Sequence, residues 1–176
     1  MQIGIAAHSD EVPEDLKEKA EKILALIKER CEDPVLILGG YWGFMKHIVD
    51  QAVKLNMKVV LILPVEQEDV EPPKGVISIR SGEEYRARSV PLVRSSDKLI
   101  VFGGSAGTII EALMGYAMGK EVLILSGNGL PSDRLECFGN FVDQRKSGKF
   151  LFFTEPEELV NELCRSVGRR TIFEKG

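Results

Sequence analysis

The sequence lacks several features that mark particular classes of protein. No run of apolar residues approaches the ~20 that span a bilayer, and the first residues, MQIGIAAHSD, have no charged segment ahead of a long apolar one, as a signal peptide has. We therefore expect a cytoplasmic protein without membrane contact. An excess of positive charge is also absent, because 23 Lys and Arg stand against 27 Asp and Glu, and Lys and Arg form no cluster interleaved with aromatic residues. Nucleic acid is therefore not an expected partner.

Cysteine is rare as well. The three cysteines, Cys31, Cys137 and Cys164, are far apart and odd in number. The sequence therefore indicates neither a disulfide framework nor a CxxC metal or redox site. We expect reduced, mostly buried thiols and no bound metal.

The pattern of apolar residues indicates the fold class. The chain has 176 residues, of which 44% are hydrophobic, and short apolar runs alternate with amphipathic stretches, as in βαβ units. We predict a single domain over residues 1–176, an α/β three-layer sandwich with a mostly parallel sheet. The acidic segment Val65–Gly75 is expected to be a surface loop, and the glycine-rich residues 127–140 form either a long connection or a flap over a ligand. The expected strands are Gln2–Ala7, Pro34–Leu38, Lys58–Leu63, Asp97–Phe102, Glu121–Leu125 and Lys149–Phe153.

One turn occurs twice along the chain. Val35 begins VLILGGYWGFMKHIVDQAVKLNMKVVLIL and Leu99 begins LIVFGGSAGTIIEALMGYAMGKEVLIL, and both run strand, GGxxG, helix, lysine, strand. Glycines let the backbone approach a ligand, and the free N–H groups of the following helix attract an anion. Two such turns at the carboxyl ends of strands predict a phosphate site, although glycines that only pack helices give the same pattern. The candidate phosphate-binding residues are Gly39, Gly40, Gly43, Gly103, Gly104, Ser105, Gly107 and Thr108.

These motifs resemble those of a known family. GGxxGTxxE after a hydrophobic strand, preceded by GGxxGxM after an earlier one, is similar to the Lonely Guy family and to the related molybdenum cofactor carrier proteins. The likeness extends from the first strand to about Leu125. The segment RSVPLVRSSDKLIVFGGSAGTIIEAL resembles the carrier branch more closely, because Arg88 precedes Asp97 by nine residues and Phe102 stands where Lonely Guy enzymes have proline.

The resemblance implies a Rossmann-like nucleotide-binding domain, an assembly of two or four chains, and a phosphorylated ligand without a required cofactor. Lonely Guy enzymes hydrolyse the base–ribose bond of a nucleoside 5′-monophosphate with an Arg and the motif Glu, and these roles map onto Arg88 and Glu111. Carrier proteins hold a phosphorylated pterin–metal cofactor without turnover, which makes a molybdopterin-like ligand the alternative. The apolar run ALMGYAMG from Ala112, with small residues such as Gly115, is a candidate for the contact between chains.

The chemistry of these two residue types suits cleavage of a glycosidic bond. A carboxylate such as Glu111 stabilises an oxocarbenium-like state or activates a water, and an arginine such as Arg88 contacts phosphate or hydroxyl groups in bidentate fashion. No second acid is evident, because Asp97 lies at the opposite end of the sheet. Glu83 and Glu84 are the remaining options. Hydrolysis, a carrier or sensor role, and a purely structural role therefore stay open.

Both candidates also have a structural explanation. Thr108 and Glu111 fit a T-x-x-E capping box, in which the acid bonds to an unpaired N–H at the start of a helix. Arg88 fits a solvated helix face that it shares with other arginines, namely Arg80, Arg86 and Arg94.

Four further residues are candidates for the pocket lining. His8 and Ser9 follow the first strand at the edge where a ligand binds in such sheets, although Ser9 or Asp10 would also serve as a helix cap. Tyr41 and Trp42 form a bulky pair in the first glycine loop. Trp42 either stacks on a planar base or pterin, or lies buried or in a contact between chains.

Overall fold

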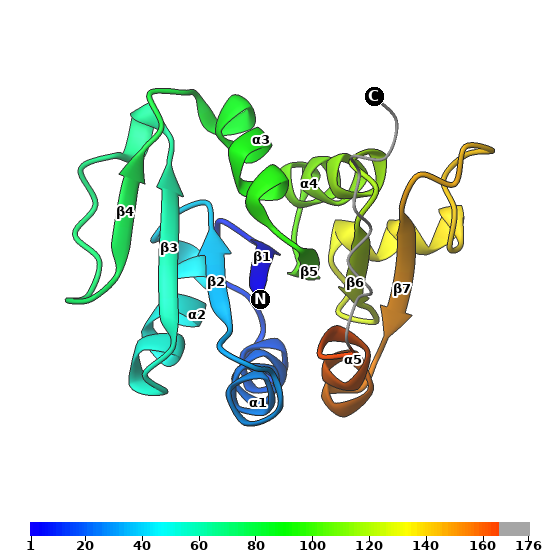
Figure 1. The fold of residues 1–176 in the computed structure, drawn as a ribbon, viewed down its shortest axis with the longest axis horizontal. Coiled ribbons are helices and arrows are strands. Elements are labelled where there is room, and N and C mark those ends of the chain that lie inside the picture. Colours follow the sequence, from blue (N-terminus) through cyan, green and yellow to red (C-terminus); the bar gives the residue numbers. More distant parts are fainter. Residues whose placement is uncertain (166–176) are drawn as a thin grey trace, which may run out of the picture.

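The sheet forms as predicted, with every strand parallel. The computed structural model describes residues 1–165, and within that range seven strands form one sheet in the order β4-β3-β2-β1-β5-β6-β7 (Figure 1). The order of the strands reverses at β1, which lies between β2 and β5. The strands are β1 Gln2–Ala7, β2 Val35–Leu38, β3 Lys58–Leu63, β4 Ile77–Arg80, β5 Lys98–Gly103, β6 Glu121–Leu125 and β7 Lys149–Phe153.

Six of these strands agree with the prediction to within one residue at either end. Strand β4 was not predicted. Its four residues are all exposed, since it lies at the edge of the sheet and contributes no residue to either core cluster. Because no face of β4 is buried, its sequence need not show the apolar pattern that distinguishes a strand from a loop. The predicted loop before it, Val65–Gly75, contains only a single 3-10 turn, η1.

Helices cover both faces of the sheet. Apolar side chains of α1, α2 and α5 pack on one face, and those of α3, α4 and the 3-10 segment η2 pack on the other. Figure 1 shows α3 and α4 above the sheet, and α1 and α5 below it. None of the helices in residues 1–165 combines the length and apolar character that crossing a bilayer requires. The helical elements are α1 Glu14–Arg30, α2 Gly43–Lys54, η1 Val65–Gln67, α3 Tyr85–Ser95, α4 Ala106–Ala117, η2 Pro131–Phe138 and α5 Pro156–Leu163.

Helix α4 approaches the sheet closely through Gly115. A Cβ atom at this position would lie 3.0 Å from Val122 Cγ2 and 3.2 Å from Leu99 Cδ2, while Ala112 and Tyr116 on the same helix are buried in the core. Within ALMGYAMG, the buried residues Ala112, Gly115 and Tyr116 therefore serve the contact between α4 and its own sheet.

A disulfide joins the ends of α1 and α5, which lie side by side (Figure 1). Cys31 and Cys164 immediately follow these helices, with their Cα atoms 5.1 Å apart and a sequence separation of 133 residues. The prediction of reduced thiols is wrong for this pair, because only the packing of the two helices brings these distant positions together. Cys137 in η2 is free and exposed.

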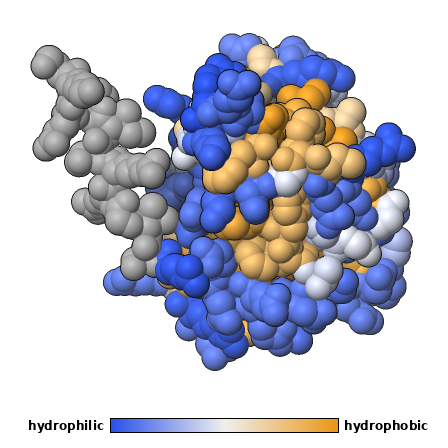
Figure 2. All heavy atoms as spheres, turned by 90° about the vertical axis from the view of Figure 1, so that its right-hand side faces the viewer, coloured by the Kyte–Doolittle hydropathy of each residue, from blue (hydrophilic) through white to orange (hydrophobic). Residues whose placement is uncertain are grey.

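The side of the molecule that carries β7 has a stripe of apolar side chains bordered by hydrophilic ones (Figure 2). Exposed apolar residues near an edge strand favour pairing with another chain. Here Asn140 covers part of the edge, because its carbonyl accepts from Phe150 N–H at 3.0 Å and its side-chain amide donates to Phe150 O at 2.7 Å. The backbone of β7 is thus engaged at Phe150 from within the same chain.

Candidate functional site

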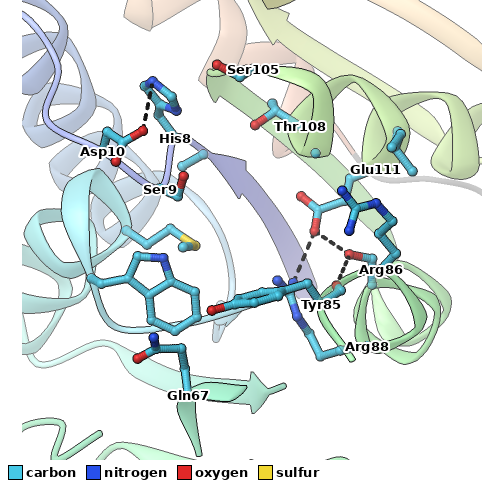
Figure 3. Close-up of a pocket in the computed structure, with 16 residues that line it drawn as sticks. His8, Ser9, Asp10, Gln67, Tyr85, Arg86, Arg88, Ser105, Thr108 and Glu111 are labelled. Atoms are coloured by element: carbon cyan, nitrogen blue, oxygen red, sulfur yellow. Dashed lines mark hydrogen bonds and ion pairs between the residues drawn. The ribbon is translucent and has the colours of Figure 1, made fainter. Parts of the chain in front are cut away.

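A cavity of about 470 Å³ opens at the carboxyl ends of the central strands (Figure 3). Its walls come from the segments that follow β1, β2, β3 and β5 and from helix α3. The cavity therefore lies where the strand order reverses, the usual place for a ligand in an open parallel sheet. Its volume is in the range of small-molecule sites.

Three polar side chains form a buried cluster in the cavity wall. Arg88 on α3 and Glu111 on α4 are only 6% and 7% exposed, and Arg88 Nη1 donates to Glu111 Oε1 at 3.1 Å. Ser89 Oγ donates to the same oxygen at 2.7 Å. The structure thus brings the two predicted catalytic candidates together and adds Ser89, which the sequence analysis did not select.

This cluster keeps unused hydrogen-bonding capacity. The Nε atom of Arg88 is buried and has no hydrogen-bond partner within residues 1–165. Both bonds to the Glu111 carboxylate end on Oε1, and none reaches Oε2 in Figure 3. Burial raises the pKa of Glu111, although Arg88 and Ser89 oppose this shift. A buried arginine donor without an acceptor is costly, so this cluster in the cavity wall is less stable than a fully paired one.

Two structural explanations from the sequence analysis are wrong. Helix α4 begins at Ala106 with Ser105 as its N-cap residue, so neither Thr108 nor Glu111 occupies a capping position. Glu111 bonds to α3 across the site instead of to its own helix start. Arg88 does not lie on a solvated helix face, because its side chain is buried against Glu111.

The second glycine loop presents a helix N-terminus to the cavity. Ser105, Gly107 and Thr108 line it, and no backbone carbonyl in residues 1–165 accepts from the N–H of Gly107 or Thr108. Gly104 is turned toward η2, where its N–H donates to Ser132 Oγ and its carbonyl accepts from Ser132 N–H, both at 3.0 Å. Within residues 127–140, Ser132 therefore holds this glycine loop in place through two hydrogen bonds. None of the residues 127–140 lines the cavity.

The first glycine loop makes room for side chains of the site. A Cβ atom on Gly39 would lie 1.7 Å from Arg88 Nη1, and one on Gly40 would lie 2.2 Å from the Trp42 indole. Neither glycine lines the cavity, whereas Trp42 does. At these two positions, the absence of a side chain thus allows Arg88 and Trp42 to take their places.

The N-terminus of α2 differs from that of α4. Gly43 has a φ of +52°, and a Cβ atom there would lie 2.1 Å from the carbonyl oxygen of Ser9. The N–H of Phe44 already donates to the carbonyl of Asp10 at 3.0 Å. Gly103, at the end of β5, also has a positive φ, +124°, which shapes the second turn. The two copies of the motif therefore differ, because Asp10 engages one of the first N–H groups of α2, whereas no backbone carbonyl in the described residues accepts from Gly107 or Thr108 of α4.

The remaining predicted lining residues divide into two groups. His8 and Ser9 line the cavity together with Asp10, and His8 Nε2 lies 3.9 Å from Asp10 Oδ2. Neither Ser9 nor Asp10 caps α1, which has Pro13 before its first residue and no side-chain cap. Tyr41 is not a lining residue, because its hydroxyl donates to Asp50 Oδ1 at 2.7 Å, away from the cavity.

The structure also settles the candidates for a second acid near Glu111. Glu83 and Glu84 do not line the cavity, and the Glu84 side chain caps α3 by accepting from Ala87 N–H at 2.8 Å. Several lining residues were missed because they follow no motif, and only their place after a strand or next to Arg88 could have indicated them. They include Gln67, Tyr85, Arg86 and Ser89.

The fold and the sequence are similar to those of known proteins. The profile of the SLOG cluster4 family matches residues 1–160. An uncharacterized protein of Archaeoglobus fulgidus is 36% identical over 125 residues, which cover 71% of this chain and 80% of that protein. The X-ray structure of TM1055 has a TM-score of 0.78 at 25% identity, covering 92% of this chain and 97% of that one. The molybdenum cofactor binding protein of the phototrophic bacterium Rippkaea orientalis has a TM-score of 0.74 at 25% identity, with coverage of 92% and 94%.

Proposed function

The chain belongs to the SLOG cluster4 family, and from this premise we propose that it binds a phosphorylated pterin-like or nucleotide-like small molecule and carries it without turnover. The resemblance to this superfamily, first seen in the glycine motifs, is confirmed. The observation that carries the proposal is the buried pair of Arg88 and Glu111 in the wall of a cavity that also holds the N-terminus of α4, whose Gly107 and Thr108 N–H groups have no backbone acceptor within residues 1–165. The similar fold of a molybdenum cofactor binding protein supports the carrier role.

The parts of the site have complementary roles in this proposal. The N-terminus of α4, with Ser105, Gly107 and Thr108, receives the phosphate, because its free N–H groups and helix dipole favour an anion. Arg88 donates to the phosphate or to an adjacent oxygen. Glu111 holds the Arg88 guanidinium in place through the 3.1 Å hydrogen bond. The ligand is the cargo, so no further cofactor is needed.

Hydrolysis of a nucleoside 5′-monophosphate is the second candidate function. Glu111 Oε2, which accepts no hydrogen bond in Figure 3, favours it, since a carboxylate oxygen open to the cavity is suited to an oxocarbenium-like state. Against it stands the lack of a buried second acid among the lining residues from the described part of the chain. The carrier role therefore accounts for more of the site.

Glu111→Gln distinguishes the two functions. The amide keeps the size of the side chain but removes its charge, so it should abolish any release of base while leaving ligand binding largely intact, as expected for an interaction made in the transition state. The measurement is liquid chromatography of free base after incubation with each common nucleoside 5′-monophosphate, alongside calorimetric binding of the same compounds and of phosphorylated pterins.

For a carrier, wild type and Glu111→Gln both bind and neither releases base. Base release by the wild type that is lost in Glu111→Gln would establish hydrolysis instead. A ligand present at 100 times its Kd should stabilise the fold by about 2.7 kcal/mol. If no phosphate, nucleotide or pterin raises the melting temperature, the proposal is wrong and the site is structural.

Gly107 offers a test of the phosphate position. A Cβ atom at Gly107 would meet nothing within 4 Å, and the residue lines the cavity. Gly107→Ala and Gly107→Leu should therefore fold normally, with a gain of roughly 0.5–1 kcal/mol from replacing a helical glycine by alanine. Binding of phosphorylated ligands should weaken in steps from Gly to Ala to Leu. Calorimetry checks the series, and equal affinity in all three proteins would place the phosphate elsewhere.

An assembly of two or four chains remains part of the proposal. Val90 on α3 and Ile110 on α4 are large apolar residues that stay 45% and 38% exposed, and Ile110 also lines the cavity. We expect them to contact another chain. Val90→Asp with Ile110→Asp should convert the assembly to monomers in light scattering at micromolar concentration. The matched control is Ile77→Asp, because Ile77 on β4 is also a large apolar residue that is exposed. If only this control dissociated the assembly, the contact between chains would lie at β4 and not at α3 and α4.

A further inference from the structure

Two aromatic side chains form a corner at one end of the cavity. Trp42 and Tyr85 both line the cavity, with ring centroids 6.1 Å apart and ring planes at 84° to each other. The Trp42 indole lies directly over the backbone of Gly40, where even a methyl group would clash with three of its ring atoms. The lack of a side chain at Gly40 therefore allows the indole to take this position beside Tyr85.

Gln67 adds a polar group beside this corner. It belongs to η1, and the segment is fixed by the bonds from Val65 N–H to Glu83 O at 2.9 Å and from Gln67 N–H to Pro64 O at 3.1 Å. Its side chain lines the cavity, and in Figure 3 no hydrogen bond joins its amide to another cavity residue. The Tyr85 hydroxyl is likewise without a partner in that view.

The corner and the helix N-terminus lie at different ends of the cavity. Figure 3 shows Ser105 and Thr108 at one end, Tyr85 and Gln67 at the other, and Glu111 at the wall between them. A ligand that fills the cavity therefore has an anion site at one end, at the N-terminus of α4, and a flat, partly polar site at the other end, at the aromatic corner.

We infer that Trp42, Tyr85 and Gln67 form a subsite for a planar nitrogen heterocycle, which stacks on the indole while the Gln67 amide bonds to its edge. This inference rests on the proposed function, since the same molecule carries its phosphate to the N-terminus of α4. Stacking on an aromatic side chain does not depend on which base is bound. The Gln67 amide, in contrast, supplies both a hydrogen-bond donor and an acceptor, so it can recognise the edge of the ring. The ligand class is thus a purine or pterin ring on a phosphorylated tail.

Trp42 itself reports on this subsite, because it is the only tryptophan in the chain. Guanosine and adenosine 5′-monophosphates should quench its fluorescence and raise the melting temperature. Ribose 5-phosphate, which has the tail without the ring, should bind about ten-fold or more weakly and leave the fluorescence unchanged. Trp42→Leu should weaken the two nucleotides by a similar factor in calorimetry and leave ribose 5-phosphate unaffected.

Gln67 variants test the contact to the ring edge. Gln67→Leu should weaken both nucleotides several-fold. Gln67→Glu keeps an acceptor and loses the donor, so it should favour guanosine 5′-monophosphate, whose edge presents two donors, over the adenosine compound. Glu66→Gln, at the neighbouring position that does not line the cavity, is the control and should change nothing.

The outcomes separate the inference from the proposed function. If ribose 5-phosphate binds as tightly as the nucleotides and no compound quenches Trp42, the heterocycle subsite is wrong while phosphate binding stands. If none of these compounds, inorganic phosphate included, changes the melting temperature or the fluorescence, the proposed function fails and the subsite fails with it. Quenching by nucleotides that persists unchanged in Gln67→Leu and Gln67→Glu would remove Gln67 from the subsite.

Discussion

Arg88→Met is expected to abolish binding of phosphorylated ligands and to destabilise the fold. Methionine keeps much of the aliphatic length but supplies no donor, so affinity should fall at least about 100-fold. Glu111 then stays buried without its cation. Leaving one partner of a buried ion pair alone typically lowers the free energy of unfolding by about 3–5 kcal/mol. Calorimetric binding and urea unfolding of the variant and the wild type measure the two effects.

The loss of stability should depend on pH in a defined direction. Burial raises the pKa of Glu111 above its ordinary value of 4.5, and Arg88 opposes that shift, so removing Arg88 raises the pKa further. For a carboxyl group whose folded pKa is raised, the stabilisation is complete below the unfolded value and is lost as pH rises through the folded pKa. The stability that Arg88→Met loses relative to the wild type should therefore be smallest below pH 4.5, the ordinary pKa of the glutamate carboxyl, and should increase as the pH rises above it.

A second substitution controls for these effects. In Arg88→Met with Glu111→Gln, no charge remains in the cluster, so stability near neutral pH should largely return while ligand binding does not. A conservative Arg88→Lys should retain the stability better than the affinity, because it keeps the charge but not the planar fork of donors. If Arg88→Met binds ligand as tightly as the wild type, Arg88 has no part in recognition.

Loss of the disulfide between Cys31 and Cys164 is expected to have the second large effect. In the chain-entropy description, closing a loop with the 133-residue separation seen here restricts the unfolded chain by up to about 5 kcal/mol. Measured values are typically 2–4 kcal/mol, which for a chain of this size lowers the melting temperature by roughly 4–16 °C. Cys164→Ser and reduction of the wild type should give the same lowered melting temperature.

The third cysteine provides the matched control for this experiment. Cys137 is exposed and free, so Cys137→Ser should melt like the wild type and respond equally to a reductant. Reductant should not change the melting of Cys164→Ser. Equal melting temperatures for the oxidised wild type, the reduced wild type and Cys164→Ser would contradict the stabilising role of the bond.

The fold was largely predictable because most strands are buried on both faces. Strands such as β5, whose residues are all buried, appear in the sequence as unbroken apolar runs. β4 escaped prediction because both of its faces are open. The disulfide escaped for a different reason, since nothing local marks Cys31 and Cys164 and only the packing of α1 against α5 brings them together.

The site was predictable where a motif marks it and not elsewhere. Arg88 and Glu111 were selected through a family resemblance, and their hydrogen bond across two helices could not be inferred from a spacing along the chain. Ser89 and Gln67 have no motif at all, because their roles come from where α3 and η1 place them. The capping-box explanation for Glu111 failed because α4 begins at Ala106, which leaves that carboxylate well inside the helix.

The disulfide also determines how the protein would respond to a stretching force. With the bond intact, tension applied at the two ends of the chain extends only the residues before Cys31 and after Cys164. β1 and α1 are the first to be pulled away, and β1 must shear from β2 and β5 on both sides. The 133-residue separation between the cysteines corresponds to about 450 Å of contour length, and this length becomes available to the force only after a reductant has opened the bond.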